Sequence, residues 1–320
     1  MGEAVATRVA YGKALCEFGS DKDIVALDAD LACCTMSIDF ARKYPERFYN
    51  VGIAEANMID IAAGFATTGK IPFCHSFAMF TAGRGYDQIR NNIAYPELNV
   101  KIIGSHAGLT VGEDGATHQC IEDVGLMRTI PGMTVIVPCD ANETREAVKA
   151  MLAYKGPCYL RTSRYENDVI TDKFSDYKFE IGKGIELKKG KDVTIVSYGL
   201  MVQIALKAAE RLIKEGIDAR IIDMHTIKPF DKDIVLKAAE ETGAIVTAEE
   251  HNIIGGLGSA VSELIVENNL VPVERVGVND MFGHSGSAEE LLELYNLNEK
   301  TIIKKVKKAI MRKNELVLDY

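Results

Sequence analysis

Short apolar runs alternate with amphipathic segments of helical length along most of this 320-residue chain, and this alternation limits the fold more than any other feature. The apolar runs, such as 193–197, have the length and composition of buried strands. The segments between them carry apolar residues at intervals of three and four, which is typical of helices with one face on a core. Strands that alternate with helices predict a parallel sheet covered on both faces, so we predict an α/β fold.

The alternation occurs in two series. The first predicts strands at 23–28, 48–51, 70–74, 100–103, 133–137 and 159–162, and helices at 4–18, 39–44, 54–67, 81–93, 121–129 and 142–154. The second predicts strands at 193–197, 218–223, 244–249 and 273–278, and helices at 201–215, 231–242, 259–268, 288–295 and 299–312.

A polar, glycine-containing segment separates the two series, and its composition is typical of a linker with at most a short hairpin. We therefore predict two domains, 1–166 and 192–320, joined by a linker over 167–191. Each domain should be a mostly parallel sheet flanked by helices.

Charge and cysteine content narrow the possible partners. The net charge is −9 without a long basic run, and no apolar stretch is long enough to span a bilayer, so we expect neither nucleic acid nor membrane as a partner. The start of the chain lacks the pattern of a signal peptide. Seven cysteines without CxxC spacing indicate reduced thiols and a cytoplasmic location.

The stretch 104–121, GSHAGLTVGEDGATHQCI, concentrates residues that can hold and protonate a polar substrate. It contains His106, Asp114 and His118 among four glycines, directly after a predicted strand. We expect a loop over a site, because this composition cannot form a packed element. A surface loop with solvated charges explains the same composition equally well.

Glu55 heads the apolar stripe of the predicted helix 54–67, which contains Met58, Ile59 and Ala62. A carboxylate in that position is either a solvated first-turn acid that favours the helix N-terminus, or a buried acid held against a ligand atom.

Aromatic, cationic and glycine-rich segments give weaker signals. Phe77 and Phe80 follow a predicted strand and could present a face to a flat ring, although such a pair is more often core. Arg8 and Arg164 could bind phosphate or lie on the surface. The glycines of 255–258 fit either a dinucleotide-binding turn or a tight strand-to-helix turn.

Together these segments resemble the C-terminal half of transketolase. The strongest likeness is GSHAGLTVGEDGATHQCIEDVGLMRTIPGMTVIVPCDANE at 104–143, followed by NVGIAEANMIDIAAGFA at 50–66. KPFD (228–231), IIGGLGSAV (253–261) and FGHSG (282–286) extend it along the chain. The resemblance implies a pyrimidine-binding domain for thiamine diphosphate in the first half and the transketolase C-terminal domain in the second.

The resemblance also implies residue roles around the cofactor. Glu55 falls on the glutamate that hydrogen-bonds N1′ of the aminopyrimidine ring, which helps the ring to remove the thiazolium C2 proton. Phe80 matches the aromatic that stacks on this ring, Phe77 lies beside it, and Asp30 matches a position that lines the cofactor.

A second group of residues matches the substrate site of the family. His118 matches a histidine that shuttles a proton near the substrate oxygens. Asp114 matches an acid that binds a sugar hydroxyl. The groups that bind the sugar phosphate correspond to Arg8, His106 and Arg164. Cys34 stands near the position of a further phosphate-binding serine, which puts that contact in doubt.

One motif of the family is missing. Transketolases bind Mg²⁺ and the diphosphate through Gly-Asp-Gly and a later Asn, and the chain contains no Gly-Asp-Gly. GEDG at 112–115 does not replace it. We therefore expect no metal ligands here, and we predict one subunit of a split transketolase that pairs with itself and with a diphosphate-binding subunit as α2β2. That partner would supply the Mg²⁺ ligands.

Other interpretations remain open. A deoxyxylulose-phosphate synthase half or a 2-oxoacid dehydrogenase β subunit would share much of the pattern, although the second lacks the GEDGxTHQ run. A non-catalytic partner with the same fold is also possible, since fold alone does not establish activity.

Overall fold

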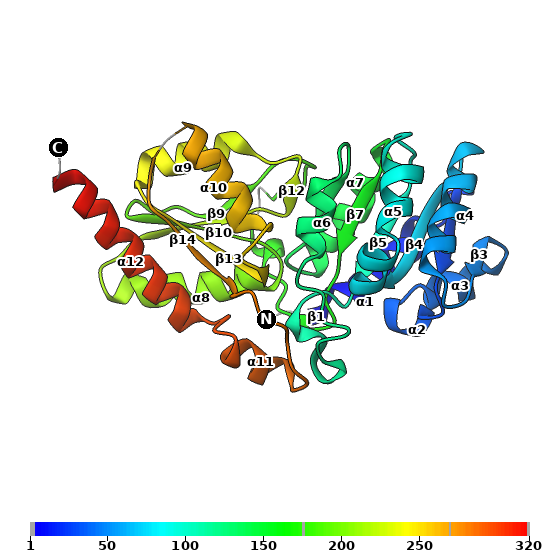
Figure 1. Cartoon of the computed structure of the whole chain (residues 1–320), viewed down its shortest axis with the longest axis horizontal. Coiled ribbons are helices and arrows are strands. Elements are labelled where there is room, and N and C mark those ends of the chain that lie inside the picture. The colour runs from blue at the N-terminus through cyan, green and yellow to red at the C-terminus, as the bar shows by residue number, and fades with distance from the viewer. Residues whose placement is uncertain (1–3, 175–176, 269, 319–320) are drawn as a thin grey trace.

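The structure is a computed structural model that describes residues 4–174, 177–268 and 270–318. It contains two sheets, each between layers of helices, and they lie side by side along the long axis (Figure 1). The first half of the chain, blue to green, forms one side, and the second half, yellow to red, forms the other. The predicted α/β fold is confirmed.

The first sheet has seven strands in the order β12-β6-β7-β5-β4-β2-β3, and every neighbouring pair is parallel except β12 with β6. Its strands are β2 Ile24–Asp28, β3 Phe48–Asn50, β4 Ile71–Phe77, β5 Lys101–Ser105, β6 Thr134–Ile136, β7 Cys158–Arg161 and β12 Thr226–Lys228.

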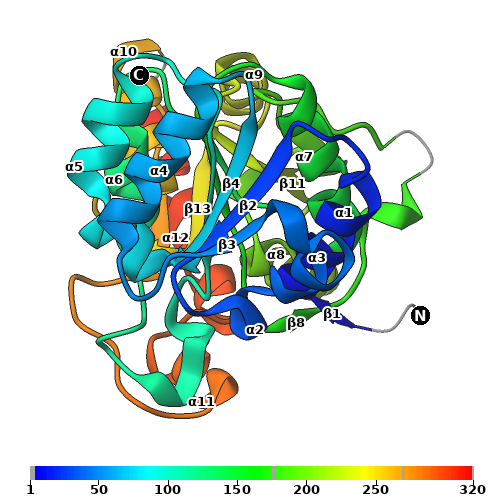
Figure 2. The same cartoon turned by 90° about the vertical axis from the view of Figure 1, so that its right-hand side faces the viewer.

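Helices cover both faces of this sheet, with α1, α3 and α7 on one side and α4, α5 and α6 on the other (Figure 2). Their bounds are α1 Thr7–Phe18, α2 Ala32–Thr35, α3 Ile38–Lys43, α4 Glu55–Thr67, α5 Tyr86–Gln88, α6 Asp123–Thr129 and α7 Ala141–Ala153. Shorter helical turns are η1 Pro45–Arg47, η2 Met79–Arg84, η3 Ile89–Ala94, η4 Leu109–Asp114 and η5 Thr171–Lys173, of which η2 and η3 are π-helical.

The second sheet has the order β14-β13-β10-β11-β9, with β9 antiparallel at its edge. Its strands are β9 Ile185–Lys188, β10 Val193–Ser197, β11 Ala219–Asp223, β13 Ile245–Asn252 and β14 Val273–Val278. Helices α9 and α10 lie on one side of this sheet and α8 and α12 on the other (Figure 1). The helices are α8 Leu200–Lys214, α9 Lys232–Thr242, α10 Leu257–Asn268, α11 Ala288–Leu294 and α12 Glu299–Leu318.

Four short strands were not predicted. Strands β1 (Val5–Ala6) and β8 (Glu166–Asn167) pair with each other, β9 lies inside the predicted linker 167–191, and β12 from the second half completes the first sheet. The segment 167–191 therefore holds more regular structure than a single hairpin. The boundaries 1–166, 167–191 and 192–320 stay predictions.

The stretch 104–121 differs from the expected loop because most of it is packed. Leu109, Thr110 and Val111 are buried in η4, and the amide of Thr110 donates to Glu250 Oε1 of β13 at 2.7 Å. Gly108 has φ +86°, and a Cβ there would lie 2.3 Å from the Glu250 carboxylate. The expectation that this composition cannot pack was wrong, because contacts from the second sheet supply the partners.

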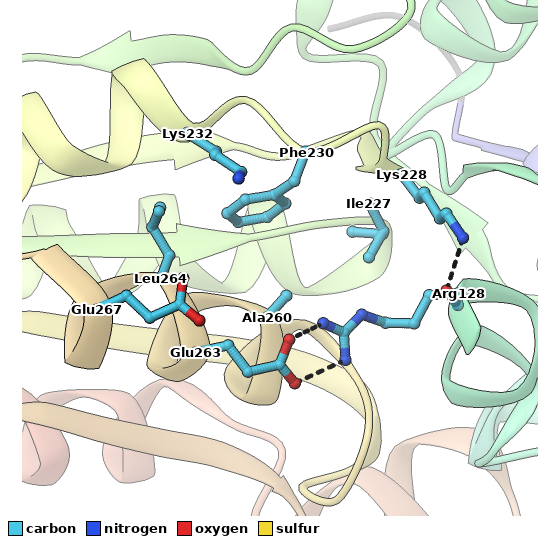
Figure 3. Close-up of a pocket in the computed structure, with 9 residues that line it drawn as sticks. All are labelled: Arg128, Ile227, Lys228, Phe230, Lys232, Ala260, Glu263, Leu264 and Glu267. Carbon is cyan, nitrogen blue, oxygen red and sulfur yellow. Dashed lines mark hydrogen bonds and ion pairs between the residues drawn. The ribbon is translucent and has the colours of Figure 1, made fainter. Parts of the chain in front are cut away.

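The junction between the two sheets contains a buried ion pair. Arg161 Nε, at the end of β7, donates to Asp123 Oδ2 at 3.0 Å, and Arg161 also donates to the carbonyl of Glu250 at 2.9 Å. A second pair lies beside a cavity of about 280 Å³, where Arg128 of α6 binds Glu263 of α10 (Figure 3). The cavity lining contains none of the predicted site residues.

A buried acidic cluster also joins the two halves of the chain. Cys139, Glu143 and Asp223 place a thiol and two carboxyl groups within 4.8 Å of one another, and both oxygens of Asp223 are without hydrogen-bond partners among the described residues. Burial, followed by the charge of Asp140, raises the pKa of Glu143 to about 7, and burial raises the pKa of Cys139 and Asp223. The cluster is therefore better suited to retaining protons than to binding a metal.

The raised pKa of Glu143 predicts a stability that falls with pH. The unfolded carboxyl has a pKa near 4.3, so the stabilisation from its protonated folded form is complete below that value and is lost as pH rises through about 7. We expect a melting temperature several degrees lower at pH 8 than at pH 6, and Glu143→Gln should reduce this difference. Glu146→Gln, on the same helix, is the control and should retain it. An unchanged pH dependence in Glu143→Gln would contradict the assignment.

Candidate active site

The candidate site lies where parallel strands of the first sheet end. Phe77 ends β4, His106 follows β5, and Arg164 follows β7. Arg8 and Glu55 come from the first turns of α1 and α4. Carboxyl ends of parallel strands share one edge of a sheet, which is where open α/β sheets place ligands.

Glu55 is buried, with 3% of its surface exposed, although it is the first residue of α4. Ser76 Oγ donates to its Oε1 at 3.3 Å, and Arg84 NH1 donates to Oε1 at 3.4 Å and Oε2 at 3.2 Å. Met58, Ile59 and Ala62 on the same helix face are buried in the core. The solvated first-turn explanation is therefore wrong, and Glu55 is a buried, paired acid.

Four rings form a continuous aromatic cluster beside this acid. Phe77 stacks on His106 at a centroid distance of 4.1 Å, and Phe77 and Phe80 are nearly parallel at 5.9 Å. His118 meets the edge of Phe80 at 5.2 Å, and Thr117 Oγ1 lies 2.9 Å from His118 Nδ1. The cluster joins the end of β4 to both histidines of the 104–121 stretch.

His106 is held in an unusual conformation and charge state. Its φ is +57°, it is buried, and Ser105 Oγ lies 2.7 Å from its Nδ1. Burial, followed by the positive charges of Arg8 and Arg164, lowers the pKa of His106 to about 3. The ring is therefore neutral near pH 7 and can exchange hydrogen bonds with a ligand without adding charge.

Arg8 and Arg164 form a cationic pole on the same side. Arg8 NH1 donates to the carbonyl of Cys34 at 2.8 Å, while Arg8 Nε is buried without a partner among the described residues. Burial and the charge of Arg164 lower the pKa of Arg8. An unpaired donor on one of two neighbouring guanidinium groups is suited to an anion such as phosphate.

The remaining predicted residues are less central. Arg164 NH1 donates to Asp114 Oδ2 at 3.5 Å and to the carbonyl of Val111 at 3.1 Å, so Asp114 is already paired with another predicted substrate residue. Asp30 is exposed with φ +67° and accepts from Asn50 Nδ2 at 2.9 Å. Among the described residues, no hydrogen bond or ion pair links Asp30 directly to the other predicted residues, so its role stays a prediction.

Sequence reasoning missed Arg84 and the contact of Ser76 with Glu55. Both residues are close in sequence to predicted ones: Ser76 directly precedes Phe77, and Arg84 follows Phe80 by four positions. A helical spacing of four from Phe80 was the available signal for Arg84.

The glycine turn at 255–258 does not leave room for a dinucleotide. The buried carboxylate of Glu249 accepts from the amides of Leu257 and Gly258 at 2.7 and 2.8 Å. A Cβ on Gly256 would lie 2.0 Å from Glu249 Oε2. The N-terminus of α10, where a dinucleotide phosphate would bind, is thus filled by a side chain of the same protein. The dinucleotide interpretation was wrong.

This contact predicts a structural role for Glu249. Glu249→Gln should lower the stability by about 1–3 kcal/mol, because it removes a charge-assisted pair of hydrogen bonds at a helix N-terminus. Urea denaturation would measure the change. The near-neutral control is Glu267→Gln, an exposed position on α10, whose N-terminus Glu249 binds. Equal stability of the two variants would contradict this role. NADH should not bind either variant or the wild type in a fluorescence titration.

Two family models match the chain, one for each half. Residues 3–168 match "Transketolase, pyrimidine binding domain", and residues 182–302 match "Transketolase, C-terminal domain". A buried acid and an aromatic cluster at the carboxyl edge of the first domain are consistent with an enzyme of this two-domain class. The chain belongs to the transketolase family.

Individual relatives agree with this assignment. A protein of Methanocaldococcus jannaschii, provisionally named a transketolase C-terminal section, is 49% identical over 93% of this chain and 94% of its own. The 6-deoxy-6-sulfo-D-fructose transketolase subunit SqwH of a Clostridium species is 46% identical over 96% of this chain and 95% of its own. A solved structure described as "Split gene transketolase, inactive beta4 tetramer" is 51% identical, with a TM-score of 0.89, and covers 97% of this chain and 99% of its own.

Proposed function

We propose that the chain is the C-terminal subunit of a split transketolase, which moves a two-carbon ketol unit from a ketose phosphate to an aldose phosphate with thiamine diphosphate. One observation carries the proposal: the buried carboxylate of Glu55 and the partly buried ring of Phe80 both contact the guanidinium of Arg84. A carboxylate can hydrogen-bond the edge of an aminopyrimidine ring, and a neighbouring aromatic side chain can stack on the plane of that ring.

The cofactor, when bound, supplies the nucleophilic carbon that attacks the ketose carbonyl. Glu55 would hold a proton at the ring nitrogen N1′, in a buried position where water does not weaken the hydrogen bond. Phe80 would support the ring, with Phe77 behind it, and Asp30 would line the cofactor near the end of β2.

The opposite end of the site would hold the sugar. Arg8, neutral His106 and Arg164 would bind its anionic group, and the unpaired Arg8 Nε supports this assignment. His118 would move a proton near the reacting oxygens, and Asp114 would bind a hydroxyl after loosening from Arg164. The relative named for 6-deoxy-6-sulfo-D-fructose indicates that the preferred sugar differs among close relatives.

The assembly follows from what this chain lacks. It has no Gly-Asp-Gly motif, so a diphosphate-binding subunit would supply the Mg²⁺ ligands, and we propose an α2β2 heterotetramer. A likeness to a split-gene transketolase supports a separate partner. None of the described helices is long and apolar enough to span a membrane. The free thiols of all seven cysteines support the proposed cytoplasmic location.

The purified chain alone should show no transketolase turnover. Adding the diphosphate-binding subunit, thiamine diphosphate and Mg²⁺ should produce sedoheptulose phosphate from pentose phosphates. Sustained turnover by the chain alone would refute the split arrangement. Release of CO₂ from an oxoacid by the reconstituted complex would favour a 2-oxoacid dehydrogenase β subunit.

Glu55→Gln should leave the fold intact and lower kcat of the reconstituted enzyme by roughly two to four orders of magnitude, because the amide cannot give a proton to N1′. Steady-state kinetics and circular dichroism test this prediction. The matched control is Asp60→Asn on the exposed side of the same helix, which should change kcat less than twofold. Wild-type turnover in Glu55→Gln would show that the proposed mechanism is wrong, and would support a non-catalytic role for this carboxylate.

A further inference from the structure

Arg84 makes two contacts at once. Its NH1 lies 3.2 Å from Oε2 and 3.4 Å from Oε1 of Glu55, and its guanidinium carbon lies 4.3 Å from the centroid of the Phe80 ring. The carboxylate is buried, whereas 54% of the Arg84 side chain is exposed. The guanidinium thus covers both groups from the solvent side.

These are the two groups that the proposed function assigns to the aminopyrimidine ring. A guanidinium is planar, carries its N–H donors in the plane, and stacks on aromatic faces. One guanidinium nitrogen pairs with Glu55 while the central carbon lies over the ring of Phe80. A cofactor ring held by the same carboxylate and the same aromatic face would require the space of the guanidinium.

We propose that Arg84 holds the place of the aminopyrimidine ring in the cofactor-free protein and must swing out before thiamine diphosphate binds. This inference rests on the proposed function. It assigns Arg84 as a positioning residue that acts through Glu55 and Phe80 and makes no contact with the reacting atoms.

The energetics of both groups agree with this role. A buried carboxylate without a cation is costly, and the single bond from Ser76 Oγ at 3.3 Å compensates for little of that cost. Arg84 stabilises Glu55 until the ring nitrogen replaces it. The half-exposed arginine can return to water without a large desolvation cost, because most of its side chain is already hydrated.

The placement of Arg84 in the chain also permits the movement. It is the last residue of the π-helical turn η2, directly before Gly85, which has a φ of −90°. π-helical turns widen the backbone and often occur at functional sites. The helix axis can therefore stay in place while the side chain changes rotamer.

The placeholder role predicts two changes of opposite sign in Arg84→Met. The melting temperature of the chain without cofactor should fall by a few degrees, because Glu55 loses its cation. The Kd for thiamine diphosphate, measured by calorimetry on the reconstituted complex with Mg²⁺, should fall by about three- to tenfold, because the cofactor no longer displaces an ion pair. If Arg84 had only a structural role, Arg84→Met would lower the melting temperature and leave the Kd for thiamine diphosphate unchanged or higher.

Two further variants sharpen the test. Arg90→Met removes an exposed arginine of the neighbouring turn η3 that bonds Asn91, and should change neither quantity. Arg84→Lys keeps the charge but loses the planar guanidinium over Phe80, so its Kd should lie between those of the wild type and Arg84→Met.

The outcomes separate the two proposals. If the wild-type complex binds thiamine diphosphate but Arg84→Met binds it equally or more weakly, the placeholder inference is overturned and the proposed function stands. If the wild-type complex does not bind the cofactor at all, the proposed function fails and this inference fails with it.

Discussion

The buried guanidinium of Arg161 links the second sheet to the first, next to the segment that carries part of the site. Arg161 lies at the end of β7 and donates to both Asp123 and the carbonyl of Glu250, so one guanidinium joins two domains. The side chain of Glu250 then holds the amide of Thr110. In this way the carboxylate of Glu250, from the second sheet, holds the stretch that carries His106 and His118. Breaking one partner of such a buried pair is far more costly than losing a surface pair, since it leaves an uncompensated charge.

The site has an acidic and a cationic pole with a neutral aromatic cluster between them. Glu55 lies at one end, Arg8 and Arg164 at the other, and Phe77 stacks on a histidine that carries no charge near neutral pH. A substrate with one anionic end would be oriented by this separation, because its charge is attracted to the end that carries Arg8 and Arg164. Orientation of this kind needs no movement of the backbone.

Local sequence patterns predicted the regular elements well, but not the contacts between them. The strands at 193–197 and 273–278 match their predicted ranges, because continuous apolar runs between polar turns leave few alternatives. The packing of 104–121 was missed because its partners, the carboxylate of Glu250 and the carbonyl of His284, are more than 100 residues away along the chain. The role of Arg84 was missed for a related reason: its partner Glu55 is 29 residues away, and a lone arginine is usually solvated.

Strand β12 has a consequence for how the protein can fold. Thr226–Lys228 comes from the second half of the chain but pairs with β6 at the edge of the first sheet. A fragment that ended before residue 226 would expose the backbone donors and acceptors of β6 as an open edge, which is a template for association with other chains. The first sheet is therefore complete only after residue 228 has been synthesised, so the first half of the chain draws one of its strands from the second half.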